Sequence, residues 1–92
     1  MGVCAIYPGT FDPITAGHID LVERSCRMFD EVIIAVAKST PKNTCFTTQE
    51  RIALAQQVLA GEDNVRVVEF QGLLVQFCQQ IGANVVVRGL RG

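Results

Sequence analysis

The sequence predicts an α/β fold: a doubly wound, Rossmann-like parallel sheet with the element order βαβαβαβ, in one domain over residues 1–92. Two observations support this prediction. Short apolar runs rich in β-branched residues alternate with stretches of helical periodicity. In addition, 49% of the residues are hydrophobic and 18% are charged, which favours a compact domain with buried strands over disorder. Right-handed crossovers between such strands give a parallel sheet with helices packed on its faces.

Four short apolar runs are the predicted strands. The first is Val3–Tyr7, and the Pro-Gly pair that follows it should stop the strand. The second is Val32–Ala37, an unbroken run of the kind that is buried on both faces of a sheet. The third and fourth strands are Val65–Phe70 and Val85–Val87.

Three helices are predicted between these strands. A capping box formed by Thr47 and Glu50 should start the second helix, and Gly61 is its expected stop. Gly82 should end the third helix. The apolar positions of the first helix are Ile19, Val22, Cys26 and Phe29, those of the second are Ile52, Ala55, Val58 and Leu59, and those of the third are Leu73, Leu74, Phe77, Cys78 and Ile81.

Charge and cysteine content argue against several classes of function. The formal net charge is −1, without the clustered basic excess that a nucleic-acid surface needs. No two of the four cysteines have C-x-x-C spacing, so reduced thiols are expected rather than a zinc or thioredoxin-type site. We find no signal peptide, and no apolar run reaches the roughly 18 residues that a membrane-spanning helix needs. The chain is therefore expected in the cytoplasm, with no nucleic acid and no membrane among its partners.

Cationic side chains follow the predicted strands at the ends where parallel sheets bind ligands. Lys38 and Lys42 come after the second strand, and Arg88 and Arg91 come after the fourth. They are half of the eight Lys and Arg residues in the chain, so we expect a site for phosphorylated small molecules at this edge. Other charges, such as Arg51 on the second helix, are expected on solvated helix faces.

The segment Tyr7–Asp20 contains the only histidine of the chain. Gly9 permits a tight turn and a close approach of the backbone to a ligand, and Thr15 is placed to cap the following helix. Helix N-termini bind anions, and His18 lies in the first turn of the expected helix. It can therefore donate a ring N–H to an anion bound at that N-terminus. We expect Asp12 to hydrogen-bond the loop backbone. The loop matches neither G-x-G-x-x-G nor G-x-x-x-x-G-K-[ST], so it is neither a dinucleotide fingerprint nor a Walker loop.

The stretch GTFDPITAGHIDLVERS resembles the nucleotidylyltransferase superfamily, whose loop reads G-T/S-F-D-x and whose helix opens with H/T-x-G-H. The second motif is represented here by Thr15-Ala16-Gly17-His18. The stretches YPGTFDPIT, GLLV and RGLR narrow the resemblance to the phosphopantetheine adenylyltransferase family. Members of that family transfer AMP from ATP to 4′-phosphopantetheine, with dephospho-coenzyme A and pyrophosphate as products.

The resemblance implies roles for individual residues. His18 would contact the ATP phosphates and stabilise the transition state, and Thr10 would bridge the attacking phosphate and the α-phosphate. The residues implied to bind ATP are Thr10, Phe11, His18, Gly89, Leu90 and Arg91. Those implied to bind phosphopantetheine are Thr10, Lys42, Leu74 and Arg88. No residue is implied as a metal ligand, because Mg²⁺ would be bound mainly through the ATP phosphates and water.

The resemblance also implies partners and a longer chain. The partners would be ATP, 4′-phosphopantetheine, dephospho-coenzyme A or coenzyme A, and further copies of the chain in a homo-oligomer, which is a hexamer in the family. Family members continue past the RGLR motif, so these 92 residues are expected to be an N-terminal portion whose sheet is cut off after the fourth strand. Two alternatives stay open. One is a nucleotidylyltransferase with another acceptor, such as glycerol phosphate or nicotinamide mononucleotide, and the other is an inactive nucleotide-binding fragment.

Overall fold

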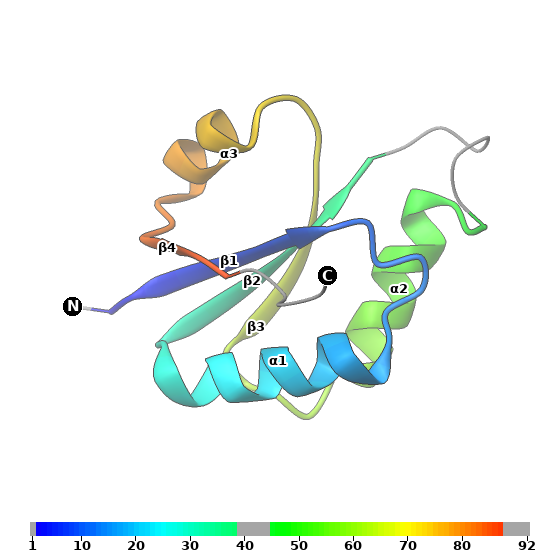
Figure 1. The fold of residues 1–92 in the computed structure, drawn as a ribbon, viewed down its shortest axis with the longest axis horizontal. Coiled ribbons are helices and arrows are strands. Elements are labelled where there is room, and N and C mark those ends of the chain that lie inside the picture. The colour runs from blue at the N-terminus through cyan, green and yellow to red at the C-terminus, as the bar shows by residue number, and fades with distance from the viewer. Residues whose placement is uncertain (1, 39–44, 88–92) are drawn as a thin grey trace.

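The computed structural model describes residues 2–38 and 45–87, which form a sheet of four strands and three helices (Figure 1). The strands are β1 (Cys4–Gly9), β2 (Glu31–Ala37), β3 (Val65–Phe70) and β4 (Val85–Val86). The helices are α1 (Ala16–Met28), α2 (Thr48–Val58) and α3 (Leu74–Ile81). They alternate in the predicted order βαβαβαβ. Among the described residues, no helix has the length and hydropathy to cross a membrane.

The sheet is parallel throughout, with the strand order β3-β2-β1-β4. β1 pairs with β2 from Cys4 to Gly9, whereas its pairing with β4 involves only Ala5 and Ile6 in the part of the chain that the structure describes. The two central strands contribute the most deeply buried residues of the sheet, which are Ala5, Ile6, Tyr7 and Val32 to Val36. The predicted parallel α/β architecture is therefore confirmed.

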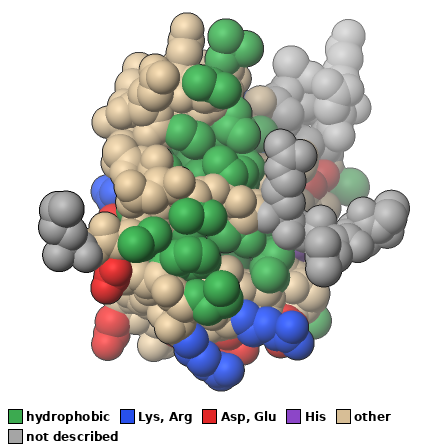
Figure 2. All heavy atoms as spheres, turned by 60° about the vertical axis from the view of Figure 1, so that its left-hand side comes forward, with side chains coloured by type: hydrophobic (Ala, Val, Ile, Leu, Met, Phe, Trp, Pro, Cys, Tyr) green, Lys and Arg blue, Asp and Glu red, His purple; other side chains and the backbone are tan. Residues whose placement is uncertain are grey.

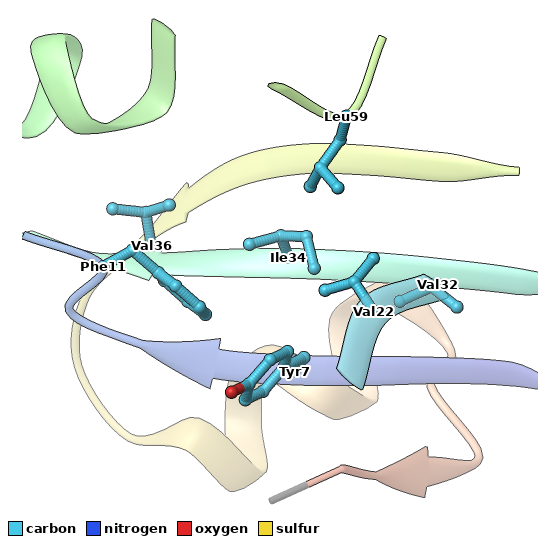
Figure 3. Close-up of a cluster of buried hydrophobic side chains, with 7 residues drawn as sticks. All are labelled: Tyr7, Phe11, Val22, Val32, Ile34, Val36 and Leu59. Carbon is cyan, nitrogen blue, oxygen red and sulfur yellow. The ribbon is translucent and has the colours of Figure 1, made fainter. Parts of the chain in front are cut away.

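Helices cover both faces of the sheet (Figure 1). On one face, α1 and α2 pack over the cluster of side chains drawn in Figure 3, which consists of Tyr7, Phe11, Val22, Val32, Ile34, Val36 and Leu59. On the other face, α3 packs over Ile6, Ile33 and Ala35. Successive side chains of a strand point to opposite faces, so neighbouring residues of β2 belong to different clusters. This two-sided cover is what the doubly wound prediction requires.

β1 continues two residues beyond its predicted end, through Pro8 and Gly9. The prediction stopped at Tyr7 because proline lacks the N–H that a sheet hydrogen bond needs. Along a parallel strand, Pro8 faces the same neighbour as Ile6, and the carbonyl of Ile6 accepts from Val87 N–H on the β4 side. The described pairing with β4 reaches only Ile6, so it requires no donor from Pro8.

The predicted helix ends are right at one glycine and wrong at another. Gly82 ends α3 in the left-handed conformation with a φ of 74°, as predicted. Gly61 does not stop α2, because that helix ends at Val58 with Leu59 as its C-cap. Leu73 was predicted as an apolar core position of the third helix, but it precedes the first turn of α3 and is 67% exposed.

Candidate functional site

The loop between β1 and α1 lies at the carboxyl end of the sheet, beside the point where the strand order reverses. From β1 the chain crosses to β2 on one side, whereas β4 lies on the other side of β1. Open α/β sheets bind ligands in the crevice at such a switch point. Thr10 and Phe11 lie in this loop, and His18 lies in the first turn of α1. The structure therefore brings these three predicted residues to one edge of the sheet.

His18 is held by a capping box at the N-terminus of α1. The Thr15 N–H donates to Nδ1 of His18 over 2.9 Å, and the His18 N–H donates to Oγ1 of Thr15 over 3.3 Å. The cap by Thr15 was predicted and is confirmed, whereas the hydrogen bond back to the imidazole was missed. Because Nδ1 accepts a backbone hydrogen, it carries no proton, and the ring proton is on Nε2. His18 is therefore a neutral donor through Nε2–H.

Two aromatic rings enclose part of His18. The ring centroid of Phe11 lies 4.9 Å from that of His18, and the ring centroid of Tyr7 lies 6.2 Å from it, both in edge-on geometry. Burial lowers the pKa of the His18 imidazole, because the charged form loses hydration. The lowered pKa and the acceptor role of Nδ1 agree, since both require a neutral ring at pH 7.

Phe11 has an unusual backbone conformation, with a φ of 50°, and its side chain is 3% exposed. Its ring packs edge-on against Tyr7, with 5.1 Å between the ring centroids. Gly9 leaves room for this ring, because a Cβ atom on Gly9 would lie 3.0 Å from Cε2 of Phe11. Gly9 was predicted to permit a tight turn and a close approach of the backbone to a ligand. The structure shows that it ends β1 and allows the inward packing of Phe11, and the approach to a ligand stays a prediction.

Asp12 joins the β1–α1 loop to the segment that precedes α2. Its Oδ2 accepts a hydrogen bond from the Cys45 N–H over 2.6 Å, and its Oδ1 accepts from the Phe46 N–H over 2.9 Å. Asp12 thus accepts from backbone N–H groups, as predicted, but from the segment before α2 and not from its own loop. The capping box of Thr47 and Glu50 follows directly and starts α2, also as predicted.

Arg51 differs from the prediction, which placed its charge on a solvated helix face. Arg51 is 0% exposed. Its Nη1 donates to the carbonyl oxygens of Thr10 over 2.7 Å and of Ala37 over 2.9 Å. The helical periodicity of the sequence indicates this burial. Arg51 lies four residues before Ala55 and eight before Leu59, and both of those residues of the α2 stripe are buried.

The other predicted site residues are described only in part. Leu74 begins α3, packs against the cluster of Ile6, Ile33 and Ala35, and lines a groove of about 510 Å³ along α3 and β4. Lys38 follows β2 and is exposed. The remaining predicted residues lie outside the described residues, and these are Lys42, Arg88, Gly89, Leu90 and Arg91. The convergence of cations at this edge therefore stays a prediction.

The chemistry of the described side chains gives no dedicated metal centre. Residues 2–38 and 45–87 contain no group of three or more His, Cys, Asp or Glu side chains that could hold a metal ion. Magnesium that arrives on a triphosphate needs few protein ligands, because phosphate oxygens and water fill most of its coordination sphere. The residues present are compatible with that mode of binding, and the Mg²⁺ expectation stays a prediction.

Comparison with known proteins gives a family and close relatives. A family model described as cytidylyltransferase-like matches residues 6–91. A phosphopantetheine adenylyltransferase of Oleidesulfovibrio alaskensis is 50% identical over 90 residues, which are 98% of this chain and 53% of that protein. One of Geotalea daltonii is 53% identical over 87 residues, which are 95% of this chain and 54% of that protein. The chain therefore spans about half the length of these curated relatives.

Two solved structures share the fold. The lipopolysaccharide core biosynthesis protein of Thermoplasma volcanium superposes with a TM-score of 0.72 at 21% identity, over 94% of this chain and 73% of its own. A NadR protein in complex with NAD and AMP-PNP superposes with a TM-score of 0.66 at 20% identity, over 77% of this chain and 21% of its own. These two likenesses confirm the Rossmann-like fold alone. The family model goes further, since it matches nearly the whole chain: the chain belongs to the cytidylyltransferase-like family, as its resemblance to nucleotidylyltransferases predicted.

Proposed function

We propose that this chain forms the nucleotide-transferring site of an enzyme that moves AMP from ATP to 4′-phosphopantetheine, giving dephospho-coenzyme A and pyrophosphate. Both curated relatives are named phosphopantetheine adenylyltransferase, a name that states phosphopantetheine as the acceptor and the adenylyl group as the group transferred. These names support the proposal. The NadR neighbour, whose structure holds NAD and AMP-PNP, supports a nucleotide site on this fold. A cytoplasmic location, the absence of nucleic-acid partners and a homo-oligomeric state belong to the same proposal.

The arrangement of His18 is the observation that carries the proposal. Its Nδ1 accepts from the Thr15 N–H, which leaves Nε2–H as the donor at the N-terminus of α1. Helix N-termini leave N–H groups without helical partners and carry the positive end of the helix dipole, so they attract phosphate oxygens. A neutral imidazole donor beside such a terminus suits the stabilisation of charge that develops on the α-phosphate in the transition state.

The proposed reaction needs no general base. The attacking phosphate of the acceptor is already an anion at neutral pH, and one of its oxygens forms the new bond to the α-phosphorus of ATP. The bond between that phosphorus and the oxygen that bridges to the β-phosphate breaks, and pyrophosphate leaves with the electron pair. Catalysis is then a matter of in-line positioning and charge stabilisation. Thr10, exposed at the end of β1, would bridge the two reacting phosphates.

The remaining residue roles in the proposal follow the resemblance. Lys42 and Arg88 would hold the phosphate of phosphopantetheine, and Leu74 would contact its arm. The segment 89–91 would lie along the nucleotide. Mg²⁺, when bound to the triphosphate, would neutralise part of its charge.

Pyrophosphate release tests the proposal. ATP is supplied with 4′-phosphopantetheine, glycerol phosphate or nicotinamide mononucleotide, and we expect release only with the first. His18→Ala should lower turnover about 10²–10³-fold. Arg24→Ala should leave it unchanged, because Arg24 is an exposed α1 residue paired with Asp20.

Other outcomes of this assay contradict the proposal in different ways. Pyrophosphate release with glycerol phosphate or nicotinamide mononucleotide would show that this compound, and not phosphopantetheine, is the acceptor. Binding of ATP in calorimetry, without release for any acceptor, would instead make the chain a nucleotide-binding unit without turnover.

A further inference from the structure

The guanidinium of Arg51 is buried where three segments meet at the carboxyl end of the sheet. Its Nη1 donates to the carbonyl oxygens of Thr10 and Ala37 over 2.7 and 2.9 Å, and its Nε donates to that of Phe46 over 3.3 Å. These residues follow β1, end β2 and precede α2, respectively. The Nη2 atom donates to Oγ1 of Thr48 over 2.9 Å, which anchors the head group to the first turn of α2.

One of these hydrogen bonds fixes the peptide between Thr10 and Phe11. Phe11 has a φ of 50°, and its ring lies 4.9 Å from the His18 ring, measured between centroids. Holding the Thr10 carbonyl therefore also fixes where the Phe11 ring lies against His18. Arg51 exerts this influence from 41 residues further along the chain.

We propose that Arg51 is a positioning residue of the β1–α1 loop, which sets the placement of Thr10 and of the Phe11 ring and, through that ring, the surroundings of His18. The consequence for ATP binding rests on the proposed function. Arginine suits this role because its planar group has five N–H donors with fixed directions. A lysine at the same position would keep the charge but would donate from a single nitrogen.

The rival interpretation is a purely structural role, in which Arg51 anchors α2 and nothing in the loop depends on it. The two roles differ in what a folded variant shows. A structural anchor changes the stability of the protein but leaves the folded loop as it was. A positioning residue changes the loop in the folded protein.

Arg51→Lys separates the two roles, with Arg24→Lys as the matched control on an exposed, ion-paired arginine. His18 is the only histidine in the sequence, so its two ring-proton NMR signals are identified without further assignment. Because the ring current of Phe11 acts on these protons, we expect both signals to shift in R51K and to stay in place in R24K. The methyl signals of the core show whether each variant is folded.

Thr48→Val is the second variant and keeps Arg51 itself. It removes an oxygen that accepts from Nη2 and leaves the bonds of Nη1 to Thr10 and Ala37 in place, so we expect a smaller shift of the same His18 signals. This variant decides the question if R51K does not fold.

Titration with ATP gives the functional readout. We expect the Kd for ATP to rise about tenfold or more in R51K, to rise less in T48V and to stay unchanged in R24K. Unshifted His18 signals in folded R51K would overturn the positioning role, and shifted signals with unchanged ATP affinity would overturn its link to the nucleotide. If the unmodified chain binds no ATP, the proposed function fails, while the His18 signals still decide the role of Arg51.

Discussion

His18 caps α1 through one ring nitrogen, and in the proposed function it would donate to a phosphate through the other. Nδ1 completes the cap of α1 by accepting from the Thr15 N–H, and Nε2–H is the donor available to a ligand. Both purposes require the same neutral tautomer. The helix cap thus prepares the imidazole for the chemistry that we propose.

Because the His18 ring is neutral in the folded chain, the stability of the protein should depend on pH. Burial holds the pKa of His18 below its ordinary value of 6.5, so the unfolded chain binds the proton more readily than the folded chain. The stabilisation is therefore complete above pH 6.5 and is lost as the pH falls through 6.5 toward the lower folded pKa. Urea unfolding midpoints across this range should decrease with decreasing pH.

His18→Gln is the control for that measurement. Glutamine is a common capping-box partner and does not titrate. The urea unfolding midpoint of the variant should therefore not show the decrease just below pH 6.5 that His18 causes in the unmodified chain. Equal pH profiles for the two proteins would contradict the assignment.

Gly9 and Gly17 provide a matched pair of glycines on either side of the loop. A Cβ atom on Gly9 would lie 3.0 Å from Cε2 of Phe11, whose ring is packed and cannot easily move, so Gly9→Ala should cost about 1–3 kcal/mol of stability. A Cβ atom on Gly17 would meet only Oγ1 of Thr15 at 3.8 Å. Gly17→Ala should be neutral or should stabilise by up to about 1 kcal/mol. Urea unfolding measures both, and equal effects would contradict the account of Gly9.

At this scale, the sequence predicted that Thr10, Phe11 and His18 lie at one edge of the sheet, but it did not predict all of their contacts. The motif and the strand position point to these three residues directly, and their roles toward a ligand stay predictions. Arg51 was misplaced because a charged residue on a helix is expected in solvent, and its burial depends on backbone carbonyls that come from distant parts of the chain. Short-range rules contain no information on such acceptors.

Both α1 and α2 begin with a threonine capping box, so we expect the two caps to contribute comparably to the stability of the protein. Thr15→Ala and Thr47→Ala should each lower the unfolding free energy by about 0.5–2 kcal/mol, measured by urea denaturation. Serine at either position should restore most of the loss. Thr15→Ala keeps the backbone N–H that donates to His18. It removes both the cap to the His18 N–H and the contact of Oγ1 with Nδ1 of His18 at 3.1 Å, so the loss at this position includes both contacts. A loss in only one of the two alanine variants would show that the caps are not equivalent.

The elements were predictable where their signals are local. The capping box of α2 and the glycine after α3 gave correct boundaries, since each acts within a few residues. The end of β1 was wrong because the tolerance for Pro8 depends on how far β4 pairs along the neighbouring edge. That is a property of the assembled sheet.

At the scale of the whole molecule, apolar side chains of the described residues are exposed on the side of α3 and β4. Figure 2 views that side and shows hydrophobic side chains gathered across it. Among the described residues of this region, Leu73 is 67% exposed, Val75 is 68% exposed and Val86 is 41% exposed. Apolar surface of this kind commonly marks a contact surface.

We therefore expect the chain to self-associate through this side, in keeping with the homo-oligomer that the resemblance implies. Sedimentation equilibrium should give a mass well above the 10.0 kDa of one chain. Val75→Glu should shift the mass toward that of one chain. Val58→Glu, at the end of α2 on the other face of the sheet, should leave it unchanged. A monomeric mass for the unmodified chain would contradict the expectation.

The contacts of the site also differ in how soon a growing chain can make them. The cap between Thr15 and His18 spans three residues, whereas the bond from Arg51 to Thr10 spans 41. Short-range contacts require little loop closure and form early. A nascent polypeptide that has not yet emerged as far as α2 already contains both residues of the cap that selects the imidazole tautomer. It reaches the final shape of the loop only once α2 has emerged and docked.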